Sequence, residues 1–186
     1  MLIGRAVAPV SNAIGVAHPA IVEYPVSLNE ISEHTPSPSF DPVLRFYDTL
    51  GLDYCPSPWR AIKARLRRSG GVDVVLYCIR RGRVSSEQVT HLRTIWQTFC
   101  RGHVPLVVVI SGVDYRRGST EEWWEMNGED LVNTVSNRIN FADHICLNTW
   151  DSHHPSWKHQ DARYEETQRL VRDLVIRHCK GLHPVS

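Results

Sequence analysis

The sequence from position 43 to position 52 reads Val43-Leu44-Arg45-Phe46-Tyr47-Asp48-Thr49-Leu50-Gly51-Leu52. Its β-branched and aromatic residues favour a β-strand, and this pattern ends at an acid that begins the sequence D-T-L-G. An aspartate followed by glycine in this way is typical of a turn. The segment therefore predicts a strand over 43–48 that turns immediately after Asp48.

Strand and helix patterns alternate along the rest of the chain. Upstream, Ile21–Leu28 predicts a strand that forms a long hairpin with 43–48, and 59–68 predicts a short helix with a solvated basic face. Downstream, strands are predicted at 72–79, 104–110 and 142–148, and the segments Ser85-Ser86-Glu87-Gln88 and Ser119-Thr120-Glu121-Glu122 match helix capping boxes. Gly102 closes the first of these helices, and a final helix carries the apolar stripe from Tyr164 to His178.

This alternation predicts an α/β fold in one domain over residues 1–186. The expected architecture is three-layer, α/β/α, around a mostly parallel sheet with one antiparallel hairpin strand. Ligands of such sheets bind beyond the carboxyl ends of the strands. Asp48, Asp114 and Asn148 stand at those predicted ends.

Composition narrows the class of partner. The net charge of +1 argues against a nucleic-acid or anionic-membrane surface spread over the whole chain. No apolar run approaches the roughly 20 residues that a membrane span needs, and the first residues lack the pattern of a secretory signal. The five widely spaced cysteines, with Cys78 and Cys146 in apolar runs, predict buried free thiols in a reducing compartment. These features indicate a cytoplasmic protein.

Several fragments occur in an order and spacing that resemble a known superfamily. They are S-N-A-I-G-V, F-Y-D-T-L-G-L, V-V-L-Y-C-I-R, F-C-x-x-x-V-P-L-V-V-V-I-S-G-V-D, E-E-W-W-E-x-N and Y-x-E-T-x-x-L-V-R. From Ser11 to about Cys179 the chain resembles the G domain of P-loop GTPases. It is most similar to uncharacterised fungal G-domain proteins that are distantly akin to the immunity-associated and ribosome-biogenesis GTPases.

The resemblance implies roles for particular residues. Asp48 matches the aspartate on the Mg²⁺ side, and Gly51 matches the glycine whose amide contacts the γ-phosphate of GTP. Ser111-Gly112-Val113-Asp114 matches the guanine-specificity motif, in which a carboxylate accepts two N–H bonds from the base. Asn148 matches the last base-contacting motif. From the residues alone, Asp48 and Asp114 can equally be turn or loop acids, and Asn148 can cap a helix.

Other parts of the pattern are missing from this sequence. It contains no G-x-x-x-x-G-K-[ST], the loop that cradles nucleotide phosphates. Ala17 stands where the resemblance places a Mg²⁺-ligating threonine, unless the register is shifted past it. Ser111-Gly112 replaces the usual Asn/Thr–Lys pair, whose lysine stem covers the base. We therefore expect a truncated chain without the first strand and the phosphate loop. Two arrangements are then open: the hairpin 21–48 pairs directly with the strand 72–79, which we expect in a compact structure, or the gap left by the missing strand stays open.

Two further clusters each have a simpler interpretation beside the functional one. His153, His154 and His159 invite a metal site, but they lie in a Ser/Pro-containing segment that is typical of a solvated loop. The arginines of Arg80-Arg81-Gly82-Arg83 face either phosphate, an acidic partner or solvent. No G-x-S-x-G and no nucleophile-like cysteine setting occurs.

Two functions follow from these observations. The first is a GTP-binding protein of the G-domain class, truncated or degenerate, with Mg²⁺ and GTP as ligands and little or no hydrolysis. The second is a pseudo-GTPase scaffold that binds a protein partner without catalysis. Its expected surfaces are Trp123, Trp124 and the segment Arg80–Arg83.

Overall fold

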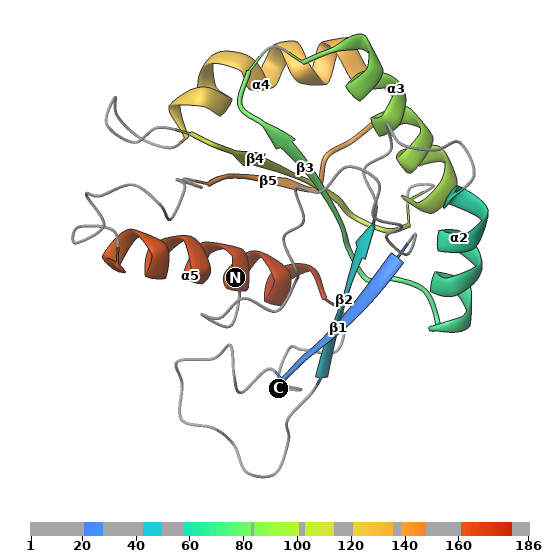
Figure 1. Cartoon of the computed structure of the whole chain (residues 1–186). Helices are drawn as coiled ribbons and strands as arrows, with labels where there is room; N and C mark the ends of the chain where they lie inside the picture. Colours follow the sequence, from blue (N-terminus) through green and yellow to red (C-terminus); the bar gives the residue numbers. More distant parts are fainter. Residues whose placement is uncertain are drawn as a thin grey trace, which may run out of the picture. The chain divides into compact units, whose positions relative to one another are not determined.

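A computed structural model of the chain describes residues 21–27, 43–49, 58–82, 84–100, 103–113, 121–135, 139–147 and 161–179. The chain divides into two compact units, Met1–Gly71 with Leu182–Ser186, and Val72–Gly181. Each unit contains its own β-sheet (Figure 1). The expectation of one domain over the whole chain stays a prediction.

The first unit contains the predicted hairpin. Strands β1 (Ile21–Ser27) and β2 (Val43–Thr49) pair antiparallel, with Ile21 opposite Thr49 and Ser27 opposite Val43. Helix α2 (Pro58–Arg68) follows. The carboxylate of Glu23 accepts hydrogen bonds from Arg45 at 3.1 Å and from Arg65 at 2.6 Å, so that one acid of β1 holds both the neighbouring strand and the helix.

Helix α2 has the amphipathic character that its sequence predicts. Ile62 is buried, whereas Arg60, Arg67 and Arg68 are exposed. The basic residues of the last turn lie near the negative end of the helix dipole, which they complement. The helix ends at Arg68, and it is followed by Gly70 and Gly71, both of which have positive φ values that favour glycine.

The second unit alternates strands and helices. Its elements are β3 (Val75–Arg80), α3 (Ser86–Ile95), the π-helical turn η2 (Trp96–Cys100), β4 (Leu106–Ser111), α4 (Glu122–Val135), β5 (Asp143–Leu147) and α5 (Asp161–His178). The strands form a parallel sheet in the order β3-β4-β5. Helices α3 and α4 lie on one face of this sheet and α5 on the other (Figure 1).

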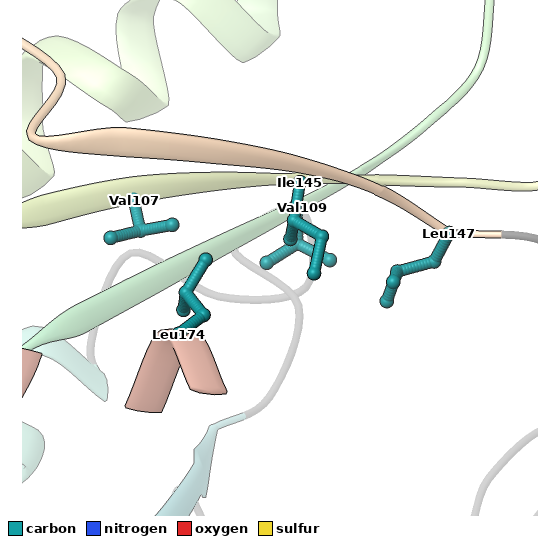
Figure 2. Close-up of a cluster of buried hydrophobic side chains, with 5 residues drawn as sticks. All are labelled: Val107, Val109, Ile145, Leu147 and Leu174. Carbon is teal, nitrogen blue, oxygen red and sulfur yellow. The ribbon is translucent and has the colours of Figure 1, made fainter. Parts of the chain in front are cut away.

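Strand β4 is the centre of the second unit. Leu106 to Ile110 are all buried, as expected of a central parallel strand that is covered on both faces. Val107 and Val109 pack with Ile145, Leu147 and Leu174 in one core cluster on the α5 side (Figure 2). Because strand side chains alternate between faces, the intervening residues of β4 and β5 point toward α3 and α4.

A polar contact fixes α5 against the start of β5. The carboxylate of Asp143 accepts hydrogen bonds from Arg177 at 2.6 Å and from the His178 ring at 3.2 Å. Burial raises the pKa of this carboxyl. The bonds from His178 and from the His144 amide, with the charge of Arg177, outweigh that effect, so the pKa lies below its ordinary value.

Helix α3 begins at its predicted capping box. The Ser85 hydroxyl accepts a hydrogen bond from the Gln88 amide at 3.1 Å, and the Gln88 side chain accepts one from the Ser85 amide at 2.9 Å. The predicted stop at Gly102 lies outside the described residues, which instead show α3 passing into η2. Arg93 ties α3 to the end of α4 by donating to the carbonyls of Val135 at 2.9 Å and Thr134 at 3.2 Å.

The α/β class is confirmed, but the expectation of one sheet is wrong for the described strands. They form two sheets, and no ladder between described residues joins the hairpin to β3. The antiparallel register runs over the whole of β1 and β2, so the inward-facing backbone groups of the two strands are paired within the hairpin. Among the described residues, no helix is both long enough and apolar enough to cross a membrane.

The described cysteines carry free thiols, and they differ in exposure. Cys146 is buried as predicted, but the expectation for Cys78 is wrong because its side chain is exposed on β3. Burial raises the pKa of the thiols of Cys100 and Cys179 to about 11. It raises that of Cys146 to about 12, with a smaller contribution from the charge of Glu121.

Candidate functional site

The carboxyl ends of the three parallel strands are held together by backbone hydrogen bonds. The Arg81 amide donates to the Ser111 carbonyl at 2.8 Å, which continues the β3–β4 ladder past the end of β3. The Val113 amide donates to the Leu147 carbonyl at 3.2 Å, which does the same between β4 and β5. The structure thus brings the ends of three strands to one edge, where ligands of parallel sheets bind.

Ser111 closes β4 at this edge. Its hydroxyl donates a hydrogen bond to the Ile79 carbonyl at 3.1 Å, so its proton is used within the sheet. The hydroxyl oxygen keeps lone pairs that can accept from a ligand. Ser111 is only half-buried, and it lies opposite Arg80 in the register of β3 and β4.

Gly112 follows Ser111 with a φ of +74°, a conformation that residues with side chains rarely adopt. A Cβ at this position would lie 3.7 Å from Cγ and 3.8 Å from Nε of Arg80. The Arg80 side chain therefore lies across the position where a side chain at residue 112 would begin. This contact was not apparent in the sequence, where the two residues are far apart.

The remaining predicted ligands are only partly described. Gly51, Asp114 and Asn148 lie outside the described residues, although Asp114 and Asn148 directly follow Val113 and Leu147 in sequence. Asp48 belongs to the first unit, where it is exposed in β2 opposite Val22. The structure thus brings Ser111 together with Arg80 and Gly112, and it describes Asp48 in a separate unit.

A second polar cluster, which the sequence analysis missed, joins α4 to β5. The carboxylate of Glu121 lies 2.9 Å from the His144 ring and accepts a hydrogen bond from the Cys146 amide at 3.4 Å. The indole of Trp124 stacks on the same imidazole, with ring centroids 4.0 Å apart and planes inclined by 10°. The only sequence signal for this cluster was the alternation that places His144 and Cys146 on one face of β5.

This cluster holds a histidine, an acid and a thiol, but its arrangement is structural. Cys146 is buried and its pKa is raised to about 12, so the thiol stays protonated at neutral pH and is a poor nucleophile. No group of three or more His, Cys, Asp or Glu among the described residues is placed to hold a metal ion. The histidines at 153, 154 and 159 lie outside the described part of the chain.

The two tryptophans that we expected on a partner surface are engaged in packing. Trp123 is buried in the second unit, and Trp124 is half-buried against His144. Of the surface expected for a protein partner, the exposed part among the described residues is Arg80, Arg81 and Gly82. Arg83 lies outside the described residues.

Comparison with protein-family models, with curated proteins and with solved structures finds no match for this chain. The structure itself gives the class of the protein, which is α/β. Its parallel three-stranded sheet carries a candidate ligand site at the carboxyl ends of the strands.

Proposed function

We propose that this chain is a G-domain-related protein that binds a guanine nucleotide weakly, mainly through the base, and does not hydrolyse GTP. One observation carries the proposal: β3 and β4 are parallel neighbours whose carboxyl ends place Arg80, Ser111 and Gly112 together. Gly112 stands two residues before Asp114 in the sequence. A carboxylate at Asp114 offers two acceptors to the N–H edge of guanine, which adenine does not match.

The weakness of binding follows from the phosphate side. The sequence contains no G-x-x-x-x-G-K-[ST], whose backbone amides and lysine supply much of the affinity for nucleotide phosphates. Phosphoryl transfer depends on positioning and charge neutralisation, so a chain that lacks these groups is not expected to hydrolyse GTP.

Nuclear magnetic resonance titration tests the base site. Addition of GMP should shift the amide signals of Arg81 and Val113, with fast exchange that indicates weak binding, and AMP should shift them much less. Asp114→Ala should weaken GMP binding by about 1–3 kcal/mol, because two guanine donors lose their acceptor. Equal responses to GMP and AMP, or no response to either, would overturn guanine binding and leave the pseudo-GTPase interaction module as the function to pursue.

Calorimetry and phosphate release test the second half of the proposal. Titration with GTP and Mg²⁺ should give no high-affinity transition, and incubation with the same mixture should release no phosphate above the rate without protein. A low-micromolar dissociation constant, or Mg²⁺-dependent phosphate release that Asp48→Asn abolishes, would contradict the proposal.

A further inference from the structure

Arg80 combines a main chain fixed by the sheet with an exposed, charged side chain. It ends β3 opposite Ser111, and the hydrogen bond from the next amide to the Ser111 carbonyl fixes the backbone beside it. Its side chain is exposed, and its guanidinium has no hydrogen-bond or ion-pair partner among the described residues. The position of the main chain is thus set by the sheet, while the charged group is available to a ligand.

The contact with Gly112 sets where this side chain lies. Because a Cβ at residue 112 would stand 3.7 Å from Cγ and 3.8 Å from Nε of Arg80, the arginine lies at contact distance over a residue that has no side chain. The positive φ of Gly112 opposes replacement by a larger residue. The side chain of Arg80 therefore lies beside Gly112, which belongs to the sequence motif that the proposed function assigns to the base.

We propose that Arg80 is a specificity-neutral stacking residue, whose guanidinium lies flat against the purine ring of the bound nucleotide. A guanidinium is planar, remains charged and is weakly hydrated, and it stacks readily on aromatic faces. Stacking on the ring face and hydrogen bonding to the ring edge by Asp114 use different parts of the same base. This inference rests on the proposed function and adds to it the group that covers the ring.

An arginine at this edge has a second use, because guanidinium groups also bind phosphate in bidentate geometry. The two uses differ in what the ligand must contain. Stacking needs the ring and not the phosphate, whereas a phosphate contact is lost when the ligand is a nucleoside. The two uses also respond differently to replacement of Arg80 by lysine. Lysine keeps the charge that attracts a phosphate, but it has no planar group that can stack on a ring.

The experiment measures the affinity of GMP and of guanosine for the full chain by saturation-transfer difference and amide-shift titration. Arg80→Ala and Arg80→Lys are compared with Arg81→Ala, the matched control, which removes the same charge from the next residue. Because both arginines are exposed, all variants should keep the thermal unfolding midpoint of the unaltered protein. Arg80→Ala and Arg80→Lys should weaken both ligands about fivefold to tenfold, and Arg81→Ala by less than about twofold.

The other outcomes overturn the inference in distinguishable ways. A loss with GMP but not with guanosine would make Arg80 a phosphate ligand, and rescue by lysine would make it a simple charge. An equal loss in Arg81→Ala would show a general electrostatic effect. If Asp114→Ala weakens GMP binding and Arg80→Ala does not, the proposed function stands without this residue. If the unaltered protein binds neither ligand, both proposals are wrong.

Discussion

At the scale of the residue, Trp124 illustrates how closely the α4 side of the sheet is packed. Its indole stacks on His144, and a Cβ added to Gly128 would lie 2.7 Å from its Cε2 atom and 2.9 Å from its Cδ2 atom. Real Cβ atoms do not approach aromatic carbons this closely, so Gly128 is required by its neighbour. The glycine lies inside a helix, where it is less stable than alanine because it loses more backbone entropy on folding. The close packing of Trp124 explains why glycine occurs there.

Gly128→Ala tests this requirement, because helix propensity and side-chain packing change the stability of this variant in opposite directions. Helix propensity alone would stabilise the variant by about 1 kcal/mol, whereas displacing the indole from His144 should cost about 1–3 kcal/mol. We expect net destabilisation in urea unfolding and a changed near-ultraviolet circular dichroism signal. Asn133→Ala is the control, because this residue is exposed on the same helix. A Gly128→Ala variant that is more stable than the unaltered protein would show that the indole moves freely.

Asp143 gives the second unit a dependence on pH that has a definite sign. Its pKa is lowered in the folded state, so the carboxylate contributes stability above its unfolded pKa of about 3.9, and this contribution is lost as pH falls through the lower folded value. Asp143→Asn should therefore be less stable at pH 7, by about 1 kcal/mol because Arg177 is largely exposed. The difference should shrink below pH 4. Urea unfolding of both proteins between pH 3 and pH 7 measures it, and a constant difference would contradict the assignment.

At the scale of the element, local patterns predicted most of the secondary structure. The strand patterns at 21–28, 43–48, 104–110 and 142–148 each became a strand shifted by no more than a few residues. The capping box at Ser85 formed as its sequence indicates, because both of its hydrogen bonds are local. These successes share one cause: the residues that decide them are close in sequence.

The elements' mutual contacts could not be predicted in the same way. The Arg93 bonds to α4, the Trp124–His144 stack and the Arg80–Gly112 contact each join residues far apart in the chain. No period or motif marks such pairs. For the candidate site, the sequence predicted that Ser111 lies at a strand end, but not that its hydroxyl is bonded to Ile79 or that Arg80 lies beside it. Three of the five predicted ligands, Gly51, Asp114 and Asn148, lie outside the described residues.

Arg93 provides a test of one such contact between elements. Arg93→Met keeps much of the aliphatic stem but removes the donors to the carbonyls of Thr134 and Val135 at the end of α4. We expect a loss of about 1–2 kcal/mol in unfolding free energy, because a charged donor forms a stronger hydrogen bond than a neutral one and the bond to Val135 is half-buried. Arg169→Met, an exposed arginine of α5, should change stability by less than about 0.5 kcal/mol. Equal effects of the two substitutions would show that the Arg93 bonds add no stability.

At the scale of the whole molecule, the second unit is organised around β4. Its neighbours β3 and β5 pair with it in register on either side, and its apolar side chains supply both faces of the core. Leu174 of α5 completes the cluster on one face (Figure 2). Stability of this unit should therefore depend strongly on a few central side chains.

Leu174→Ala should destabilise the second unit by about 2–5 kcal/mol, because the side chain is 4% exposed and its loss leaves a cavity. Amide hydrogen exchange of β4 and β5 is the measurement, since it reports on this unit alone. Val43→Ala, which truncates a side chain that is 55% exposed, should cost only a few tenths of a kcal/mol. A similar small cost for Leu174→Ala would mean that α5 does not cover the sheet in solution.

The buried cysteines of the second unit can report its unfolding, because their thiols react with an alkylating reagent only when they become exposed. Cys100, Cys146 and Cys179 lie in η2, in β5 and just after α5, and an alkylating reagent attacks only the thiolate that their raised pKa values suppress. Among the described cysteines, iodoacetamide at pH 8 should label the exposed Cys78 first, and mass spectrometry of the digested protein would then give the labelling rates of the three buried ones. One shared rate would describe a unit that opens as a whole. Earlier labelling of Cys179 would indicate that α5 detaches from the sheet before the sheet itself unfolds.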